Sequence, residues 1–272
     1  MPLVTFLSDY GVSDEFAAVC CGVMRRVLPS VEILDVSHGV AHGDIRGGAL
    51  MLARAIPYLP EGVHLAIVDP GVGTERKAVA LETTDGRLFV GPDNGLLSPA
   101  VALSGGAVRA VVLDPSRWGM ADPSPTFAGR DVFAPAAAAL AGGVSLEEVG
   151  EPVSADGLVP LILALPQVED GAASGVVFWI DRFGNVQTNI TEVQLHELGI
   201  TLGDTLEVVH AGRTERMPFV RTFADADKGR LLAFIDSAGQ LGVGVNMGNA
   251  AAELGVIDGA AIEVRRAHSG LI

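Results

Sequence analysis

The sequence is poor in cysteine and in positive charge. Its two cysteines, Cys20 and Cys21, are adjacent within an apolar helical pattern, so we expect packed thiols rather than a disulfide, as in the reducing cytosol. Lysine and arginine number 18 against 33 aspartates and glutamates, which leaves a net charge of −15. Because such a surface repels phosphate groups, we expect no nucleic-acid partner.

Long hydrophobic runs are also missing. The alanine-rich run over residues 134–141 is too short to cross a membrane and is interrupted by Pro135. The first residues lead straight into a predicted strand, so we expect neither a signal peptide nor a membrane partner. With 49% hydrophobic and 19% charged residues, the chain is expected to be a soluble cytoplasmic protein with a substantial core.

Several common catalytic and cofactor-binding motifs are absent. There is no phosphate-binding loop, no GxSxG elbow and no paired CxxC. Residues 71–73 lack the third glycine and the helix of a dinucleotide fingerprint. His38, His42 and Asp44 fit no standard zinc spacing, and we interpret them as ordinary loop residues. We therefore expect no metal and no cofactor.

What is present in the first half is an alternation of strand-like and helix-like segments. Three apolar, β-branched runs have the character of strands: residues 3–7, 31–36 and 63–68. Helical periodicity separates them over residues 14–28, where Ser13 is the expected N-cap, and over residues 44–56. This order predicts an α/β fold with a mostly parallel sheet flanked by helices.

Polar side chains follow the ends of these three strands, namely Asp9, His38 and Asp69. Because ligands of α/β proteins bind outside the carboxyl ends of parallel strands, these residues are candidates for a site. Arg76 follows Asp69 by seven residues, after a Pro/Gly turn. Taken alone, residues 67–76 are explained equally well as an ordinary turn with a solvated arginine. Asp9, taken alone, is more simply a turn acid that precedes a helix.

The second half has a different pattern of predicted secondary structure. A hairpin over residues 78–90, a strand at 108–113 and an alanine-rich helix reaching residue 141 precede it. After residue 174, short strand-like runs alternate with turns and one short helix at 192–198, which predicts a small β-barrel. We therefore predict an N-terminal α/β domain over residues 1–168 and a C-terminal β-barrel domain over residues 172–272, divided at residues 169–171.

The second half contains two turn clusters, and the first of them suits a nucleoside. In residues 181–189, Asn185 offers a donor and an acceptor to a purine edge, and Phe183 offers a stacking face. The other cluster comprises residues 236–239 and 245–249. Each cluster, considered by itself, is explained more simply as a turn or glycine-rich loop between strands.

Together, the clusters resemble a known family. Its motifs occur here in the family's order as SDYG, LDVSHG, VDPGVGTER, GPDNGLL, TFAGRD, IDRFGNVQTNI, DSAG and VNMGNAA. Over nearly its whole length the chain resembles the S-adenosylmethionine (SAM) hydroxide adenosyltransferases and, more distantly, the fluorinases and chlorinases. The resemblance implies hydrolysis of SAM to adenosine and methionine without a cofactor. It also implies a homotrimer whose sites lie between neighbouring subunits.

The resemblance assigns roles to residues in both halves. Asp69 and Arg76 match two members of the family's Asp-Arg-His catalytic set, and Ala128 stands where the histidine is usual. The implied substrate-binding residues are Asp9 for the ribose hydroxyls; Phe127 and Phe183 for the flanks of the nucleoside; Asn185 with the backbone at Val245 and Met247 for adenine; Asp181 and Ser237 for the amino acid end; and Gly129, which the chlorinase shares.

Two positions bear on the reaction. The halogenases have tyrosine where Asp69 stands, and a carboxylate would repel a halide by several kcal/mol in a pocket of low dielectric, so halogenation is the weaker alternative. Loss of a general base at position 128 typically lowers a rate by about 10²- to 10⁴-fold. Ala128 is compatible with a weakened hydrolase, with a non-catalytic SAM or adenosine binder, or with a chain altered to trap a ligand; the otherwise intact site favours the last.

Overall fold

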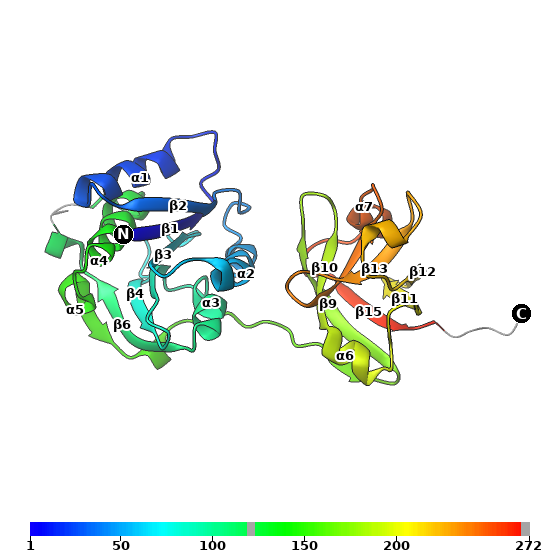
Figure 1. Cartoon of the computed structure of the whole chain (residues 1–272). Helices are drawn as coiled ribbons and strands as arrows, with labels where there is room; N and C mark the ends of the chain where they lie inside the picture. The colour runs from blue at the N-terminus through cyan, green and yellow to red at the C-terminus, as the bar shows by residue number, and fades with distance from the viewer. Residues whose placement is uncertain (119–122, 268–272) are drawn as a thin grey trace, which may run out of the picture. The chain divides into compact units, whose positions relative to one another are not determined.

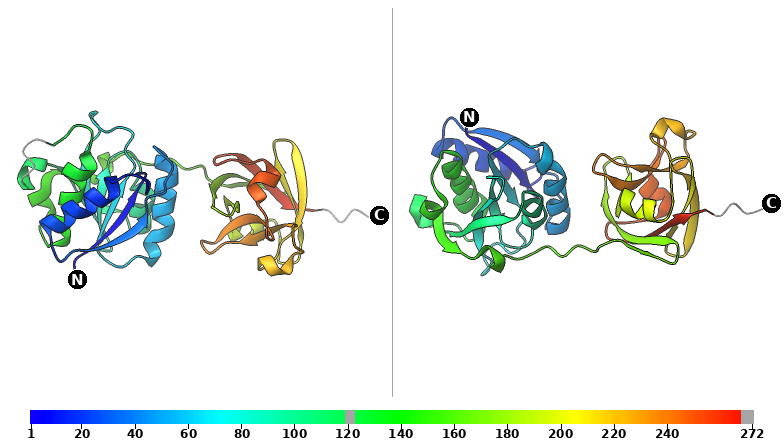
Figure 2. Two further views of the ribbon diagram at one scale, coloured as in Figure 1. Left: turned by 90° about the horizontal axis from the view of Figure 1, so that it is seen from above. Right: turned by 60° about the horizontal axis from the view of Figure 1, so that its bottom comes forward.

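The computed structural model describes residues 1–118 and 123–267 and divides into two compact units, Met1–Leu161 and Ile162–Ile272 (Figures 1 and 2). The sequence places the domain boundary at residues 169–171, which comprise the last residue of β8 (Gln167–Glu169) and the two-residue turn before β9 (Ala172–Ile180). Among the residues described, no helix combines the length and the apolar character needed to span a membrane.

A seven-stranded sheet runs through the first unit in the order β2-β1-β3-β5-β4-β6-β7. Its strands are β1 (Leu3–Ser8), β2 (Glu32–Ser37), β3 (Val63–Ile67), β4 (Ala78–Thr83), β5 (Leu88–Pro92), β6 (Ala107–Leu113) and β7 (Gly150–Val153). The first four in this order are parallel, and the remaining pairs are antiparallel. All five residues of β3 are buried because helices cover both faces of the sheet. The predicted α/β fold is confirmed.

Two helical layers cover this sheet. One contains α1 (Phe16–Val27), a π-helical turn (Gly129–Phe133), α4 (Ala134–Ala141) and α5 (Leu146–Val149); the other contains α2 (Ile45–Ala55) and α3 (Ser98–Leu103). Four alanines of α4 are completely buried, and their small side chains allow this helix to pack closely between the sheet and α1.

The predicted cap of α1 is wrong, whereas α2 begins where expected. Ser13 was the expected N-cap, but α1 begins at Phe16 after Glu15, and no described side chain caps its first turn. The ring of Phe16 packs against Tyr10 at 5.9 Å between centroids, so tertiary packing fixes this helix start. In α2, the Oδ1 atom of Asp44 accepts a hydrogen bond from the Gly47 amide at 2.8 Å.

The second unit is an antiparallel sheet that is nearly closed into a barrel, as predicted. Its order is β12-β11-β15-β9-β10-β14-β13, with β8 beside β9. The strands not yet given are β10 (Val186–Thr191), β11 (Thr205–His210), β12 (Arg213–Pro218), β13 (Leu231–Ile235), β14 (Gln240–Val245) and β15 (Ala261–Arg266). A bridge between Phe219 and Ala233 joins the segment after β12 to β13. Helices α6 (Glu192–Glu197) and α7 (Ala250–Leu254) complete the unit.

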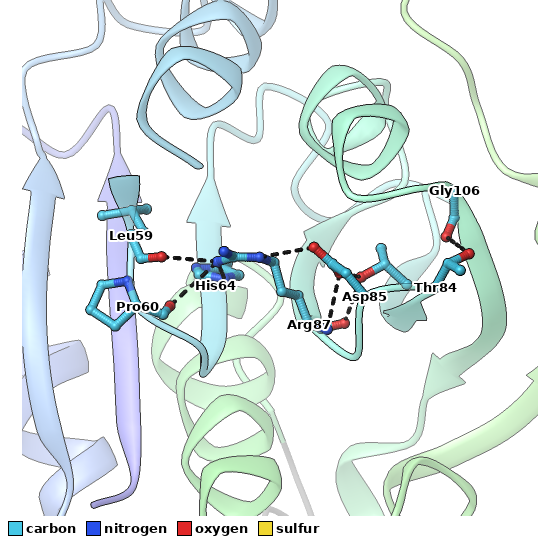
Figure 3. Close-up of polar contacts among 8 residues, drawn as sticks. Leu59, Pro60, His64, Thr84, Asp85, Arg87 and Gly106 are labelled. Carbon is cyan, nitrogen blue, oxygen red and sulfur yellow. Dashed lines mark hydrogen bonds and ion pairs between the residues drawn. The ribbon is translucent and has the colours of Figure 1, made fainter. Parts of the chain in front are cut away.

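A buried histidine lies near the start of β3, away from the end of the strand that carries Asp69. The Nδ1 atom of His64 is 2.9 Å from Thr5 Oγ1. Its Nε2 atom is 3.2 Å from Arg87 Nη1 (Figure 3). Arg87 also donates to the carbonyl of Leu59 and, through Nε, to Asp85. Burial, followed by the nearby charge of Arg87, lowers the pKa of His64 to about 4.

We expect the free energy of unfolding to decrease as the pH falls from about 6.5 to about 4. In this window the unfolded chain protonates His64 while the folded chain keeps it neutral, so stability rises with pH, by up to about 3 kcal/mol. Denaturant unfolding followed across these pH values measures the slope. The variant His64→Gln should show a flatter slope, and His196→Gln, on an exposed position of α6, should keep it. Equal slopes in the unaltered chain and His64→Gln would contradict the assignment.

Candidate active site

Asp9 and Asp69 follow neighbouring parallel strands and lie at the carboxyl edge of the first sheet. The strands β1 and β3 are paired in parallel, and the Asp9 amide donates to the carbonyl of Ile67 at 3.2 Å. The Oδ2 atom of Asp9 accepts a hydrogen bond from the Gly43 amide at 2.9 Å and lies 3.6 Å from His42 Nδ1. The loops that follow β1, β2 and β3 therefore converge at this edge.

His38, the third of the strand-end residues, stabilises the turn after β1. Its Nδ1 atom lies 2.7 Å from Ser8 Oγ, and its Nε2 atom lies 3.2 Å from Asp35 Oδ1. Ser8 Oγ also accepts a hydrogen bond from the Tyr10 amide at 3.3 Å. Although these are the residue types of a serine-hydrolase triad, Ser8 is fully buried and its oxygen is engaged by the backbone. The arrangement fixes the turn and does not present a nucleophile.

Asp69 and Arg76 form a bidentate ion pair at this edge. Arg76 donates from Nε to Asp69 Oδ1 at 3.0 Å and from Nη2 to Oδ2 at 2.5 Å. The guanidinium also lies over the ring of Phe133, 5.2 Å from its centroid. Burial raises the pKa of Asp69 above its usual range, although the charge and hydrogen bonds of Arg76 oppose the increase. A carboxylate in this state accepts a proton more readily than one in water.

These loops border a cavity of about 420 Å³. Of the residues that the sequence proposed, five line it: Asp9, Asp69, Phe127, Ala128 and Gly129. Arg76 is not among the lining residues and reaches the cavity through Asp69. Six further lining residues were not predicted from the sequence: Tyr10, Asp14, Phe16, His42, Val72 and Thr126. Of these, Tyr10 lay next to Asp9 within the same motif, and that position was the available signal.

Residues 127–133 are held by hydrogen bonds and by aromatic packing. The buried Asp131 accepts two hydrogen bonds from Arg130, at 2.6 and 2.7 Å, and one from the Ser124 amide at 2.8 Å. Phe127 meets Tyr10 edge-to-face, with centroids 6.0 Å apart. Gly129 lies directly against the phenol, because a Cβ atom placed on it would be 2.0 Å from the Tyr10 hydroxyl. A residue with a side chain at position 129 would therefore displace Tyr10.

The second unit contains the remaining proposed residues, and the carboxylate of Asp181 organises the first of them. Its Oδ1 atom accepts from the amides of Phe183 and Asn185, each at 2.9 Å, and its Oδ2 atom accepts from Asn185 Nδ2 at 2.9 Å. Phe183 is 68% exposed, and the guanidinium of Arg182 lies over its ring. One N–H of the Asn185 side chain is engaged by Asp181, which leaves its second N–H to donate and its oxygen to accept a hydrogen bond.

The structure groups Val245 and Met247 with this turn but separates Ser237 from it. The start of β10 pairs with the end of β14, and Gly184 packs against Asn249 after that end. Met247 is 78% exposed and Val245 is buried. Ser237 lies in the turn between β13 and β14, which is roughly 17 Å away along β14 at about 3.3 Å per residue.

Asp181 therefore lies at the end of the barrel that carries Asn185, and Ser237 lies at the other end. If both contact one ligand, they do so at positions separated by the length of β14. Among the described residues, no three His, Cys, Asp or Glu side chains are grouped so that they could bind a metal ion.

Most of the chain matches the models of one protein family. The family model of the SAM hydroxide adenosyltransferase N-terminal domain matches residues 4–150, and that of the C-terminal domain matches residues 175–263. The chain belongs to the SAM hydroxide adenosyltransferase family. The two matched ranges lie one in each compact unit.

Similar members of this family have been named. The chain is 47% identical to the (R)-S-adenosyl-L-methionine hydrolase of Salinispora tropica, with 97% of each chain covered. It is 42% identical to the hydrolase of the same name from Thermus thermophilus, covering 94% of this chain and 96% of that one. A fluorinase of an Actinoplanes species is 33% identical to this chain, and the match covers 90% of this chain and 91% of the fluorinase. A solved structure of an uncharacterized conserved protein from Thermotoga maritima matches with a TM-score of 0.91 and 37% identity, covering 97% and 100%.

We predict that Gly129→Ala destabilises the first unit by about 1–3 kcal/mol, because the added methyl group overlaps the Tyr10 hydroxyl. Chemical denaturation measures the loss. Adding Tyr10→Phe to this variant should recover part of it, since the overlapping oxygen is then removed. Gly22→Ala is the control: it lies in α1 with no atom within 4 Å of the new Cβ, and should leave stability equal or higher. Equal stability of the two alanine variants would contradict the assigned contact.

Proposed function

We propose that this member of the family hydrolyses (R)-S-adenosyl-L-methionine to adenosine and L-methionine. The observation that carries the proposal is the Asp69–Arg76 ion pair at the wall of the cavity that also contains Asp9. The names of the relatives from Salinispora tropica and Thermus thermophilus support the same reaction. SAM is the substrate, and the reaction needs no cofactor.

In this proposal, Asp9 binds the two ribose hydroxyls through charge-assisted hydrogen bonds. Phe127 and Phe183 flank the nucleoside. Asn185 and the backbone near Val245 form hydrogen bonds with the edge of the adenine. Ser237 binds the methionine portion, and Asp181, at the other end of β14, holds Asn185 in place for adenine through its hydrogen bonds. Met247 contributes its backbone to the adenine site, and Gly129, packed against the Tyr10 hydroxyl, forms part of the cavity wall. The resemblance to the family implies a homotrimer, and we infer that neighbouring subunits of such a trimer complete each site in the cytoplasm; the division of the proposed residues between the two compact units is compatible with this.

The reaction is a single displacement at C5′ of the ribose. A water oxygen forms the new bond to C5′ while the C5′–S bond breaks, and its electron pair returns to sulfur as neutral methionine. One proton of the water passes to Asp69, whose raised pKa suits this role. Arg76 keeps the carboxylate in place through its two hydrogen bonds. The sulfonium is a good leaving group and needs no general acid.

Two alternative functions each depend on the residue at one position, 69 or 128. A carboxylate at position 69 disfavours a halide nucleophile, so halogenation of SAM is the weaker one. Ala128 favours the other alternative, a protein that binds SAM or adenosine without turnover, because the methyl group cannot take a proton. Turnover above the rate of buffer alone separates hydrolysis from binding.

We predict that Asp69→Asn lowers the rate of adenosine release by about 10²- to 10⁴-fold, since the amide cannot accept the proton of the attacking water. Chromatography of adenosine and methionine measures the rate, and calorimetry of SAM binding checks that the site persists. The control is Asp156→Asn, at an exposed residue outside this cavity, which should retain the original rate. Loss of activity in both variants would indicate a general effect of removing negative charge.

We also predict that Ala128→His raises turnover by about 100-fold, because it restores a general base at the cavity wall. The same assay compares the two proteins on SAM. Equal activity would mean that Asp69 and Arg76 suffice without the histidine. If neither protein releases adenosine, the hydrolase proposal fails, and calorimetry then tests binding alone.

A further inference from the structure

We propose that the hydroxyl group of Tyr10, together with Asp69, holds the attacking water. This inference rests on the proposed hydrolysis and adds a residue to it. Tyr10 is not part of the Asp-Arg-His catalytic set, and it lines the same cavity as Asp69 and Ala128.

The structure holds Tyr10 in one position from several sides. Its amide donates to Ser8 Oγ, so the backbone is part of the turn that His38 fixes. Its ring meets three others edge-on or tilted, with centroid distances of 6.5 Å to Phe6, 5.9 Å to Phe16 and 6.0 Å to Phe127. A side chain packed in this way keeps its polar end in a defined place.

The polar end of Tyr10 lies at the wall formed by the loop that carries Ala128. The hydroxyl oxygen is the atom nearest to the position of a Cβ on Gly129, followed by the adjoining ring carbons. Ala128 itself contributes only a methyl group there. The hydroxyl is thus a polar group on this side of the cavity, immediately beside a residue that has none.

The chemistry requires a second contact to the water besides Asp69. Arg76 already donates to both oxygens of Asp69, and a water bound to that carboxylate alone remains free to rotate. A hydrogen bond to Tyr10 would fix its orientation and leave one lone pair for C5′, which is the requirement for in-line attack. Tyr10 gains and loses no proton in this step; the proton passes to Asp69.

The surroundings keep this hydroxyl neutral. Burial raises the pKa of Tyr10 far above its ordinary value, and Cys20, Asp9 and Asp69 add to the increase in that order. The group therefore orients the water as a hydrogen-bonding partner and does not act as a base.

The test compares Tyr10→Phe with Tyr58→Phe. Tyr58 is the second of the two tyrosines in the chain and is 77% exposed, so it is a matched control for loss of a hydroxyl. We expect Tyr10→Phe to lower kcat for SAM hydrolysis by at least tenfold, with KM for SAM, adenosine affinity and melting temperature close to those of the unaltered chain. Tyr58→Phe should change none of them.

Three outcomes would overturn the inference. An unchanged kcat in Tyr10→Phe would mean that the hydroxyl does not contact the water. Parallel losses in kcat, adenosine affinity and melting temperature would assign Tyr10 to packing. If the unaltered chain showed no turnover, the proposed hydrolysis itself would be wrong. This outcome is distinguishable from the first two, in which the unaltered chain is active.

A double-variant cycle with Ala128→His adds an independent measurement. Two groups that contact the same water have effects that do not multiply. We therefore expect Tyr10→Phe to reduce kcat by a smaller factor in the Ala128→His background, about twofold to threefold, than in the unaltered chain. If Tyr10→Phe reduced kcat by an equal factor in both backgrounds, the two positions would act independently. That result would contradict the proposal that both contact the same water.

Discussion

The hydrogen-bonded pair of Asp69 and Arg76 is the interaction on which the proposed chemistry depends. A carboxylate at the end of a fully buried strand is costly unless a positive charge is held against it, and the bidentate geometry supplies that charge. The opposing effects of burial and pairing leave Asp69 ionisable but with an increased tendency to take up a proton. The same pair removes the rotational freedom of both side chains, and this makes the cavity wall rigid before any ligand enters.

The parallel arrangement of β1, β2 and β3 is what brings the other polar groups to this pair. Adjacent parallel strands end at one edge, and the loops after them must cross the same space. Asp9 and His38 are thereby placed next to each other with different functions: one carboxylate faces the cavity, and one imidazole fixes the turn behind it. Placement by strand order explains why Asp9 and Asp69, 60 positions apart in sequence, lie within one site.

Much of this could be predicted from the sequence, for physical reasons. Continuous apolar runs indicate strands, so β1, β2 and β3 and the residues at their ends were found, although β2 lies at the edge of the sheet and none of its residues is buried. The strands β10 and β14 were missed because they contain polar residues and glycines; at Gly242 a side chain would strike the ring of Phe234, which no local pattern reveals. The contact of Gly129 with Tyr10 was missed for the same reason, since it joins residues far apart in the chain. The separation of Ser237 from Asn185 follows from the pairing of β10 with β14, and a motif match carries no such distance.

The contact between Gly129 and Tyr10 makes the two positions a single steric unit. Together they fill a fixed volume at the cavity wall, and either residue can be enlarged only if the other is reduced. Substitutions there are expected to be tolerated in pairs during evolution, and a chain that acquired a side chain at position 129 would have to give up the phenol. The residues at positions 10 and 129 would then jointly determine the width of the cavity on this side.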